Sequence, residues 1–146
     1  MSRPSFFIRL ADWDKDQLLL KQVRKEVFIE EQEVPLELEW DGEDAAARHL
    51  IALDAEQRPI GTARLLPSGQ IGRMAVIKTW RSQGVGTALL KQLLMEAKSS
   101  GYPEPFLNAQ LSALPFYAQQ GFYPEGEIFQ EAGIPHQRMT RRPWNG

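Results

Sequence analysis

The stretch that decides the fold begins with the strand-like run Gln70-Ile71-Gly72-Arg73-Met74-Ala75-Val76-Ile77 and continues into Arg81-Ser82-Gln83-Gly84-Val85-Gly86-Thr87. The leucines that follow recur on one side of a helix that is expected to run to about residue 100. Glycine lets a backbone approach a ligand closely, and the first N–H groups of a helix point outward with the positive end of the helix dipole behind them. The sequence therefore predicts an anion-binding turn between a strand and a helix.

Two common phosphate-binding patterns do not fit this turn. A dinucleotide-binding turn needs a third glycine at the position that Leu89 occupies, and a Walker A loop needs a Gly-Lys pair, which the chain lacks. Taken alone, the two glycines are explained equally well by a ligand-binding turn and by a tight turn with no ligand.

Composition excludes several classes of protein. The 146 residues, 42% hydrophobic and 25% charged, are typical of one globular domain, which we expect to span residues 1–146. No apolar run approaches the ~20 residues of a membrane helix, and the N-terminus lacks the apolar stretch of a secretory signal. Without cysteine there is no disulfide, thiolate metal site or cysteine nucleophile. We expect a cytoplasmic protein with no metal and no membrane partner, and the sequence leaves open whether it forms a homodimer.

Charge is distributed unevenly along the chain. Nine of the nineteen acidic residues lie between Glu26 and Asp44, where there is no Lys or Arg, which leaves ten acidic residues against seventeen basic ones elsewhere. This acidic segment (residues 26–44) is suited to attract a cationic partner, although a solvated acidic loop is the simpler alternative. No basic stripe is interleaved with aromatic residues, so nucleic acid is not an expected partner.

The order of apolar runs and turns predicts an α+β fold. A helix is expected from Asp12 or Asp14 to about residue 32, a second from 84 to 100, and a short third one after Ser112; residues 33–43 are expected to be a loop. The expected strands are 5–10, 49–53, 60–66, 71–77, 105–110, 122–129 and 136–142. The turns around 54–59 and 67–69 favour an antiparallel meander of the second, third and fourth strands.

A second motif narrows the choice of ligand. The run Phe116-Tyr117-Ala118-Gln119-Gln120-Gly121-Phe122 follows the Arg81-x-x-Gly84-x-Gly86 turn by about thirty residues. With both motifs the chain resembles the GNAT superfamily of N-acetyltransferases, which bind acyl-coenzyme A (acyl-CoA) through such a turn. A closer likeness, carried by residues 23–35, Asp41, Asp44, His49 and 132–136, is to a bacterial subgroup called ElaA-like or YjcF-like. The resemblance implies three layers, α/β/α, with a mixed and mostly antiparallel sheet flanked by helices.

The resemblance also implies a binding site for acetyl-CoA as cosubstrate. The pyrophosphate is expected on the backbone N–H groups of residues 83–87 beside Arg81, and the pantetheine arm along the strand, with the N–H of Val76 facing the thioester carbonyl. The expected cofactor-binding residues are Met74, Ala75, Val76, Arg81, Ser82, Gln83, Gly84, Val85, Gly86, Thr87 and Asn108.

Catalysis is expected to be direct attack of an amine on the thioester, because no cysteine is present to form an acyl-enzyme. By resemblance Tyr117 is the acid that protonates the departing sulfur; its alternative role is packing and hydrogen bonding within a helix. Glu31 continues the i, i+4 row of Val23 and Val27, so a carboxylate on an apolar face is expected there, with a raised pKa and the role of general base. The alternative for Glu31 is a solvated helix end.

The acceptor is expected to be a primary amine of a small cationic molecule, drawn to the acidic segment. The candidate substrate-binding residues are Glu30, Asp41, Asp44 and His49. Capping and turn formation are the alternatives for the two aspartates, and His49 and His136 are each more often structural than catalytic. A non-catalytic acyl-CoA-binding sensor or partner protein is the alternative function.

Overall fold

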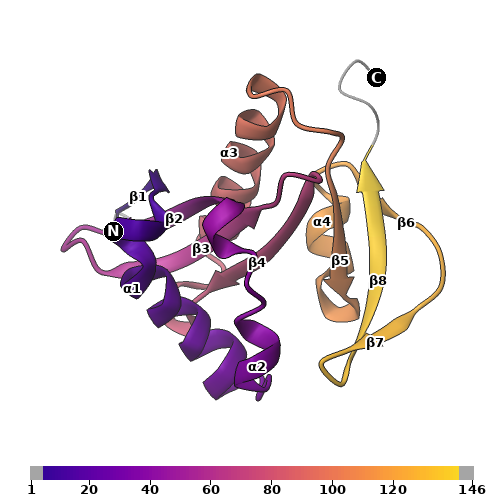
Figure 1. Cartoon of the computed structure of the whole chain (residues 1–146), viewed down its shortest axis with the longest axis horizontal. Coiled ribbons are helices and arrows are strands. Elements are labelled where there is room, and N and C mark those ends of the chain that lie inside the picture. Colours follow the sequence, from indigo (N-terminus) through magenta and orange to yellow (C-terminus); the bar gives the residue numbers. More distant parts are fainter. Residues whose placement is uncertain (1–4, 142–146) are drawn as a thin grey trace.

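The computed structural model describes residues 5–141. One half of its sheet is formed by β1 (Phe6–Ala11), β2 (Arg48–Asp54), β3 (Pro59–Leu65) and β4 (Gln70–Val76), each antiparallel to the next (Figure 1). The antiparallel meander predicted for the second, third and fourth strands is confirmed. The central strands β2 and β3 are almost entirely buried because helices cover both faces of the sheet.

The other half of the sheet is built around β8. Its strands are β5 (Phe106–Gln110), β6 (Phe122–Pro124), β7 (Phe129–Glu131) and β8 (Ile134–Arg141), in the overall order β1-β2-β3-β4-β5-β8-β6, with β7 also on β8. The single strand predicted over 122–129 is wrong, because the chain turns at Gly126, whose φ is 85°, and resumes pairing with β8 afterwards. The predicted end of the last strand at Arg142 lies outside the described residues.

Helices lie on opposite faces of the meander. Alternate residues of β2 show this, because Leu50 and Ala52 pack in the same core cluster as α3 (Val85–Ser99), whereas Ile51 and Leu53 pack with Leu20 of α1 (Trp13–Arg24). The short α4 (Leu114–Ala118) follows β5 on the α3 side. The predicted mixed, mostly antiparallel sheet flanked by helices is confirmed (Figure 1).

The first long helix changes its winding at Lys25. Residues Lys25–Glu31 form a π-helix, and the N–H of Gln32 donates to the carbonyl of Val27, five residues earlier, over 3.1 Å. The predicted extent to about residue 32 is therefore right, but its last seven residues are not α-helical. Wider winding moves residue i+4 off the face of residue i, so Val27 is buried while Glu31 is exposed.

The polar stretch predicted as a loop contains a short helix, α2 (Leu36–Glu39). Pro35 precedes it, a position where proline needs no hydrogen-bond donor. Four residues of alternating Leu and Glu give no helical period, so sequence periodicity could not reveal this helix. It ends on Glu39, whose side chain is buried.

The two halves of the sheet part between β4 and β5. These parallel strands pair only at Gln70 with Phe106 and at Ile71 with Leu107. A β-bulge then inserts Arg73 and Met74 opposite a single residue of β3, and Arg73 adopts a φ of 48°. Beyond the bulge the strands diverge, which opens the middle of the sheet (Figure 1).

Candidate active site

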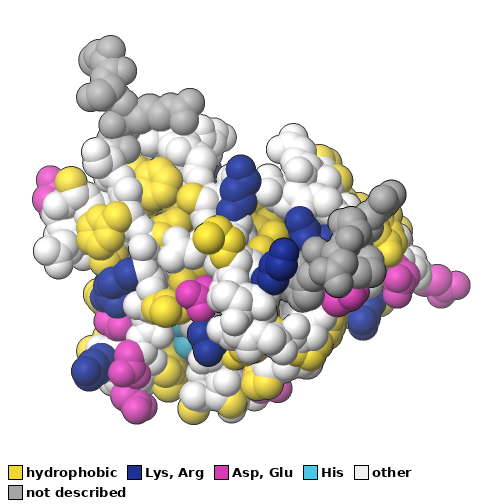
Figure 2. All heavy atoms as spheres, turned by 90° about the horizontal axis from the view of Figure 1, so that it is seen from above, with side chains coloured by type: hydrophobic (Ala, Val, Ile, Leu, Met, Phe, Trp, Pro, Cys, Tyr) yellow, Lys and Arg dark blue, Asp and Glu magenta, His cyan; other side chains and the backbone are white. Residues whose placement is uncertain are grey.

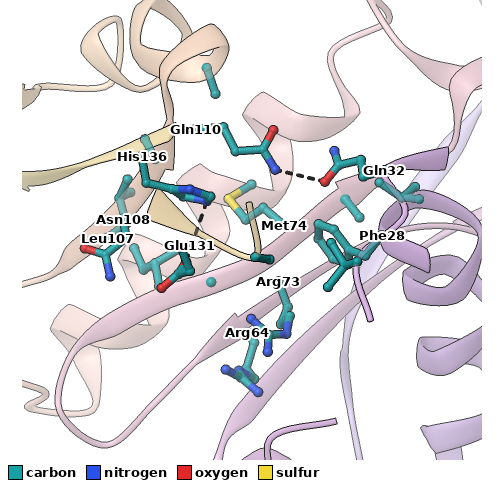
Figure 3. Close-up of a pocket in the computed structure, with 18 of the residues that line it drawn as sticks. Phe28, Gln32, Arg64, Arg73, Met74, Leu107, Asn108, Gln110, Glu131 and His136 are labelled. Atoms are coloured by element: carbon teal, nitrogen blue, oxygen red, sulfur yellow. Dashed lines mark hydrogen bonds and ion pairs between the residues drawn. The ribbon is translucent and has the colours of Figure 1, made fainter. Parts of the chain in front are cut away.

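A cavity of about 590 Å³ fills the opening between the two halves of the sheet. One wall carries Met74 of β4 and Phe28 of the π-helix, and the facing wall carries Asn108, Gln110 and His136 of β5 and β8 (Figure 3). A bond of 2.9 Å from the Gln110 amide to the Gln32 amide spans the two walls. The cavity is therefore bounded by elements from both halves of the sheet.

The end of β4 presents backbone groups to this opening. The N–H of Ile77 donates to the carbonyl of Ile60 on β3 over 3.0 Å. Antiparallel pairs alternate between bonded and non-bonded positions, so the next pair, Gly61 with Val76, is non-bonded and its β4 member turns its N–H and C=O away from β3. The Val76 carbonyl accepts a bond of 2.9 Å from Nε of Arg81, and its N–H is left as a donor on the β5 side.

The glycine turn is open to solvent on the side where a ligand would approach. Gly84 is the N-cap of α3 with a φ of 88°, and a Cβ built on it would meet no atom within 4 Å. At Gly86, by contrast, a Cβ would lie 3.4 Å from the Phe116 ring, so this glycine allows α3 to approach α4 closely. Because the first turn of an α-helix leaves its N–H groups without partners in the helix, the turn fits an anion such as a pyrophosphate.

Glu31 is held by the arginine of the same turn. Nη1 and Nη2 of Arg81 donate to its two carboxylate oxygens over 2.7 and 2.6 Å. This hydrogen bonding lowers the pKa of Glu31, so the raised pKa expected from an apolar face is wrong. The reason is the π-helical winding, which exposes 39% of the Glu31 side chain.

Three acidic residues of the acidic segment belong to a network of ion pairs. Arg24 of α1 binds Glu39 and Asp44 over 2.7 and 2.8 Å. Arg64 of β3 binds Asp44 and Asp41 over 3.1 and 2.9 Å. Arg73 of the β4 bulge adds contacts of 3.2 Å to Glu39 and 3.1 Å to Asp41; we call these six residues the arginine network. Neither a solvated loop nor an open anionic surface describes this part of the segment.

The arginine network shifts the pKa of its acids in opposite directions. Burial alone would raise the pKa of Asp41, but hydrogen bonds from Arg64 and from the N–H of Glu43, with the nearby arginine charges, lower it to about 2. Burial raises the pKa of Glu39 despite its arginine partners. Asp41 is thus held ionised, with its charge already balanced.

The four expected substrate-binding residues do not come together. Among Glu30, Asp41, Asp44 and His49, Asp41 lines the main cavity and the other three do not. His49 is buried, lies 2.9 Å through Nε2 from the carbonyl of Asp44 and stacks on Trp13 with ring centroids 5.1 Å apart. Its contacts are those of a structural histidine.

Tyr117 does lie at the cavity, as the second motif implied. Its ring packs edge-on against Phe116 and Phe122, with centroids 5.0 and 6.1 Å away. Burial raises the pKa of Tyr117 to about 12, so the phenol is protonated at neutral pH. Asn108, Met74, Ala75, Val76 and Arg81 line the same cavity, while the backbone of 82–87 lies at the helix end.

Several residues at the cavity were not expected from the sequence. They are Gln32, Arg64, Arg73, Gln110 and, as more than a structural group, His136. The one available signal was the presence of Arg64 inside an otherwise apolar run, since a charge on a buried strand needs a partner. The partners of Arg64 come from the acidic segment, twenty and twenty-three positions away, and no local pattern identifies them.

Comparison with known proteins identifies the family to which this site belongs. Residues 11–143 match the family model described as an acetyltransferase (GNAT) domain. The chain belongs to the GNAT acetyltransferase family. It is 39% identical over 123 residues to the "Uncharacterized N-acetyltransferase YjcF" of Bacillus subtilis (strain 168), covering 82% of this chain and 87% of that protein. It is 33% identical over 132 residues to ElaA of Escherichia coli (strain K12), covering 84% of each.

Solved structures agree with the sequence comparison. An acyl-CoA N-acyltransferase from Pseudomonas aeruginosa superposes with a TM-score of 0.84 at 29% identity, over 94% of this chain and all of that one. Escherichia coli ElaA gives 0.84 at 28% identity, over 93% and 99%. This GNAT protein is therefore an acetyltransferase, and its family implies an acyl-CoA cosubstrate and a small-molecule acceptor. Within residues 5–141 no helix is long and apolar enough to cross a membrane.

Proposed function

We propose that this GNAT protein transfers an acetyl group from acetyl-CoA directly to the primary amine of a small molecule that is cationic in solution. The observation that carries the proposal is an opening in the sheet that is lined by Val76, Asn108 and Tyr117 and also by Arg81, the first residue of the glycine turn. A site for a long, phosphate-bearing donor needs such an opening beside an anion-binding helix end.

The donor side of the proposed site is built from backbone. The N–H groups at the start of α3 bind the pyrophosphate, and Arg81 adds positive charge beside them. The N–H of Val76 donates to the thioester carbonyl and stabilises the negative charge that develops on its oxygen. Asn108 is a further contact from β5. The bound acetyl-CoA supplies an activated acetyl thioester.

The acid and the acceptor side rest on side chains. Tyr117, kept protonated by burial, donates a hydrogen bond and then a proton to the departing sulfur. Asp41 is the one expected acceptor-binding residue that lines the cavity, and because Arg64 and Arg73 already balance its charge, it would contact an ammonium group as a hydrogen-bond acceptor rather than as a free charge. Glu31 lies beside the opening, but its ion pair with Arg81 makes it a weaker base than the sequence suggested. A cytoplasmic location stays a prediction.

A pair of variants tests the glycine turn. Gly84→Asp places a carboxylate in the open space over the helix N-terminus, whereas Gly84→Asn has the same size without the charge. Asparagine also tolerates the positive φ of this residue, so backbone strain is smaller in the control. We expect the aspartate to weaken acetyl-CoA binding by about a hundredfold, because it repels the pyrophosphate at close range, and the asparagine to weaken it far less. Titration calorimetry measures both, and equal affinities would contradict the placement.

The transfer itself is tested with a panel of small amines. Thiol release from acetyl-CoA should depend on a primary amine, and cationic amines should react faster than amines that carry a carboxylate. Tyr117→Phe should lower kcat and leave acetyl-CoA affinity unchanged, since the hydroxyl acts at the sulfur. Tight binding of acetyl-CoA with no transfer to any amine would overturn the proposal and favour a non-catalytic sensor.

A further inference from the structure

One buried ionisable group at the cavity has no part in the proposed mechanism. His136 lies on β8, paired in register with Gln110 of β5. Paired residues of neighbouring strands point to the same face, and Gln110 and Asn108 both line the cavity. The imidazole is 93% buried and faces the cavity from the wall opposite Met74 (Figure 3).

The contacts of the ring define its tautomer. Nδ1 lies 2.7 Å from the carbonyl oxygen of Ile134, on the same strand. A carbonyl oxygen accepts but never donates, so Nδ1 carries the hydrogen and Nε2 of the neutral ring carries a lone pair. Phe129 of β7 stacks on the ring, with centroids 6.0 Å apart and planes inclined by 26°, and holds its orientation.

A proton accepted by Nε2 can reach solvent through Glu131. Oε2 of Glu131 lies 3.6 Å from Nε2, and 53% of the Glu131 side chain is exposed. The other charged residues that line the cavity are Glu39, Asp41, Glu43, Arg64, Arg73 and Arg81, and Arg138, also on β8, stacks on Phe106. The carboxylate of Glu131 is therefore in position to accept a proton from Nε2.

We propose that Nε2 of His136 is the general base that removes a proton from the acceptor ammonium, and that Glu131 passes this proton to solvent. This inference rests on the proposed acetyl transfer. The ammonium gives one proton to Nε2, and its freed lone pair forms the new N–C bond to the acetyl carbon. The C–S electron pair leaves with the sulfur, which takes a proton from Tyr117, and the second nitrogen proton restores the Tyr117 hydroxyl. The products are an amide, a thiol and one proton released to water.

The geometry favours His136 over Glu31 for this role. Glu31 is not among the residues that line the cavity, and both of its oxygens are engaged by Arg81. Nε2 of His136 accepts no hydrogen bond from the described residues, and it lies in the same cavity as Tyr117 and Asn108. The base and the acid then come from two different elements, β8 and α4.

The closing experiment compares pH profiles. His136→Gln keeps a polar group near the position of Nε2 but removes the base. At neutral pH, kcat/KM for the amine should fall by about a hundredfold, and the deficit should shrink as the pH approaches the pKa of the amine, because free amine then needs no base. Glu131→Gln should lower the rate by a smaller factor, and Glu127→Gln, at an exposed residue of the same region, is its control.

The outcomes separate the two proposals. An active wild type whose His136→Gln variant loses less than threefold, or loses the same factor at every pH, overturns the role of His136 alone. A wild type that binds acetyl-CoA but acetylates no amine overturns the proposed function and this role together. Unchanged melting temperature and acetyl-CoA affinity of the variant show that the fold is intact.

A second measurement needs no turnover. The chain has two histidines, and their contacts require opposite tautomers, because Nε2 of His49 faces the carbonyl of Asp44 while Nδ1 of His136 faces that of Ile134. Nitrogen-15 correlation spectra at high pH should show one Nε2–H and one Nδ1–H imidazole, with the second signal missing in His136→Gln. A His136 ring protonated at Nε2 in its neutral form would overturn the inference.

Discussion

Arg81 links the end of β4 to the end of the π-helix. Its Nε binds the carbonyl of Val76, and its other nitrogens bind Glu31 at the end of the π-helix. The residue that is expected to contact the pyrophosphate is therefore engaged by the acceptor side of the site before any ligand binds. Exchanging one anionic partner for another costs little when the pair is as exposed as this one.

Glu31→Gln distinguishes a holder of Arg81 from a base. Removing the charge frees Arg81 for the pyrophosphate, and since an exposed ion pair contributes at most about 1 kcal/mol, acetyl-CoA should bind up to about fivefold more tightly. The value of kcat should change little. Calorimetry and steady-state rates give both numbers, with Glu30→Gln, on the exposed neighbour, as control. A loss of kcat of a hundredfold or more would restore Glu31 as the base.

Among the elements, the bulge of β4 has the largest effect on the site. It places Arg73 in a left-handed conformation that a non-glycine residue adopts at a cost, and it ends the pairing that would otherwise close the sheet. Hydrogen bonds of two residues, Arg73 and Thr62, hold the bulge in this conformation. The Arg73 guanidinium binds Asp41 and the carbonyls of α2, and the hydroxyl of Thr62 on β3 donates to the Arg73 carbonyl over 3.0 Å.

Thr62→Val tests how far this hydrogen bond maintains the opening. The substitution keeps the shape of a buried side chain and removes its donor, so unfolding free energy should fall by about 1 kcal/mol. If the bond maintains the opening, acetyl-CoA affinity should fall by up to about fivefold as well. Denaturant unfolding and calorimetry measure the two effects. Thr140, in the other half of the sheet, donates its hydroxyl to exposed Glu125, so Thr140→Val should change neither quantity, and equal effects of the two variants would contradict the role of Thr62.

For the molecule as a whole, the arginine network joins α1, α2, β3 and β4. Three of the nine acidic residues of the acidic segment are thereby paired with arginines from other elements. On the face drawn in Figure 2, acidic and basic side chains are interspersed with apolar ones and no patch of a single sign forms. Removing one partner from such a buried network leaves an uncompensated charge, which destabilises a fold far more than losing an exposed pair.

The pH dependence of stability follows from this network. The pKa of Asp41 falls from its ordinary value of 3.8 to about 2 on folding. A depressed carboxyl pKa stabilises the fold fully above the unfolded value and loses that contribution as the pH falls through the folded value. Asp41→Asn should therefore lower the unfolding free energy by about 2 kcal/mol at neutral pH, with the gap closing between pH 4 and 2. Urea titrations at each pH measure it, Glu37→Gln is the exposed control, and a gap that persists below pH 2 would contradict the role of Asp41.

Local patterns were sufficient for most of the elements. The apolar runs of β2 and β3, the leucine spacing of α3 and the glycine at its start are each patterns of neighbouring residues, so the sequence alone predicts these elements. The sequence also predicted the extent of the first helix, but it did not predict the change to π-winding. Val23 and Val27 are buried in either winding, and only the position of Glu31 differs between the two.

The sequence by itself determined the elements on which the proposed donor side rests: a strand, a glycine turn and the helix that follows it. The tertiary structure alone decided which residues surround the proposed acceptor side. Asp41 is paired with Arg64, and Glu31 is paired with Arg81. The proposed base, His136, lies beside Gln110 only because β8 pairs with β5. Helix ends are fixed by neighbours in the chain, whereas an ion pair or a shared cavity depends on which distant strands the fold brings together.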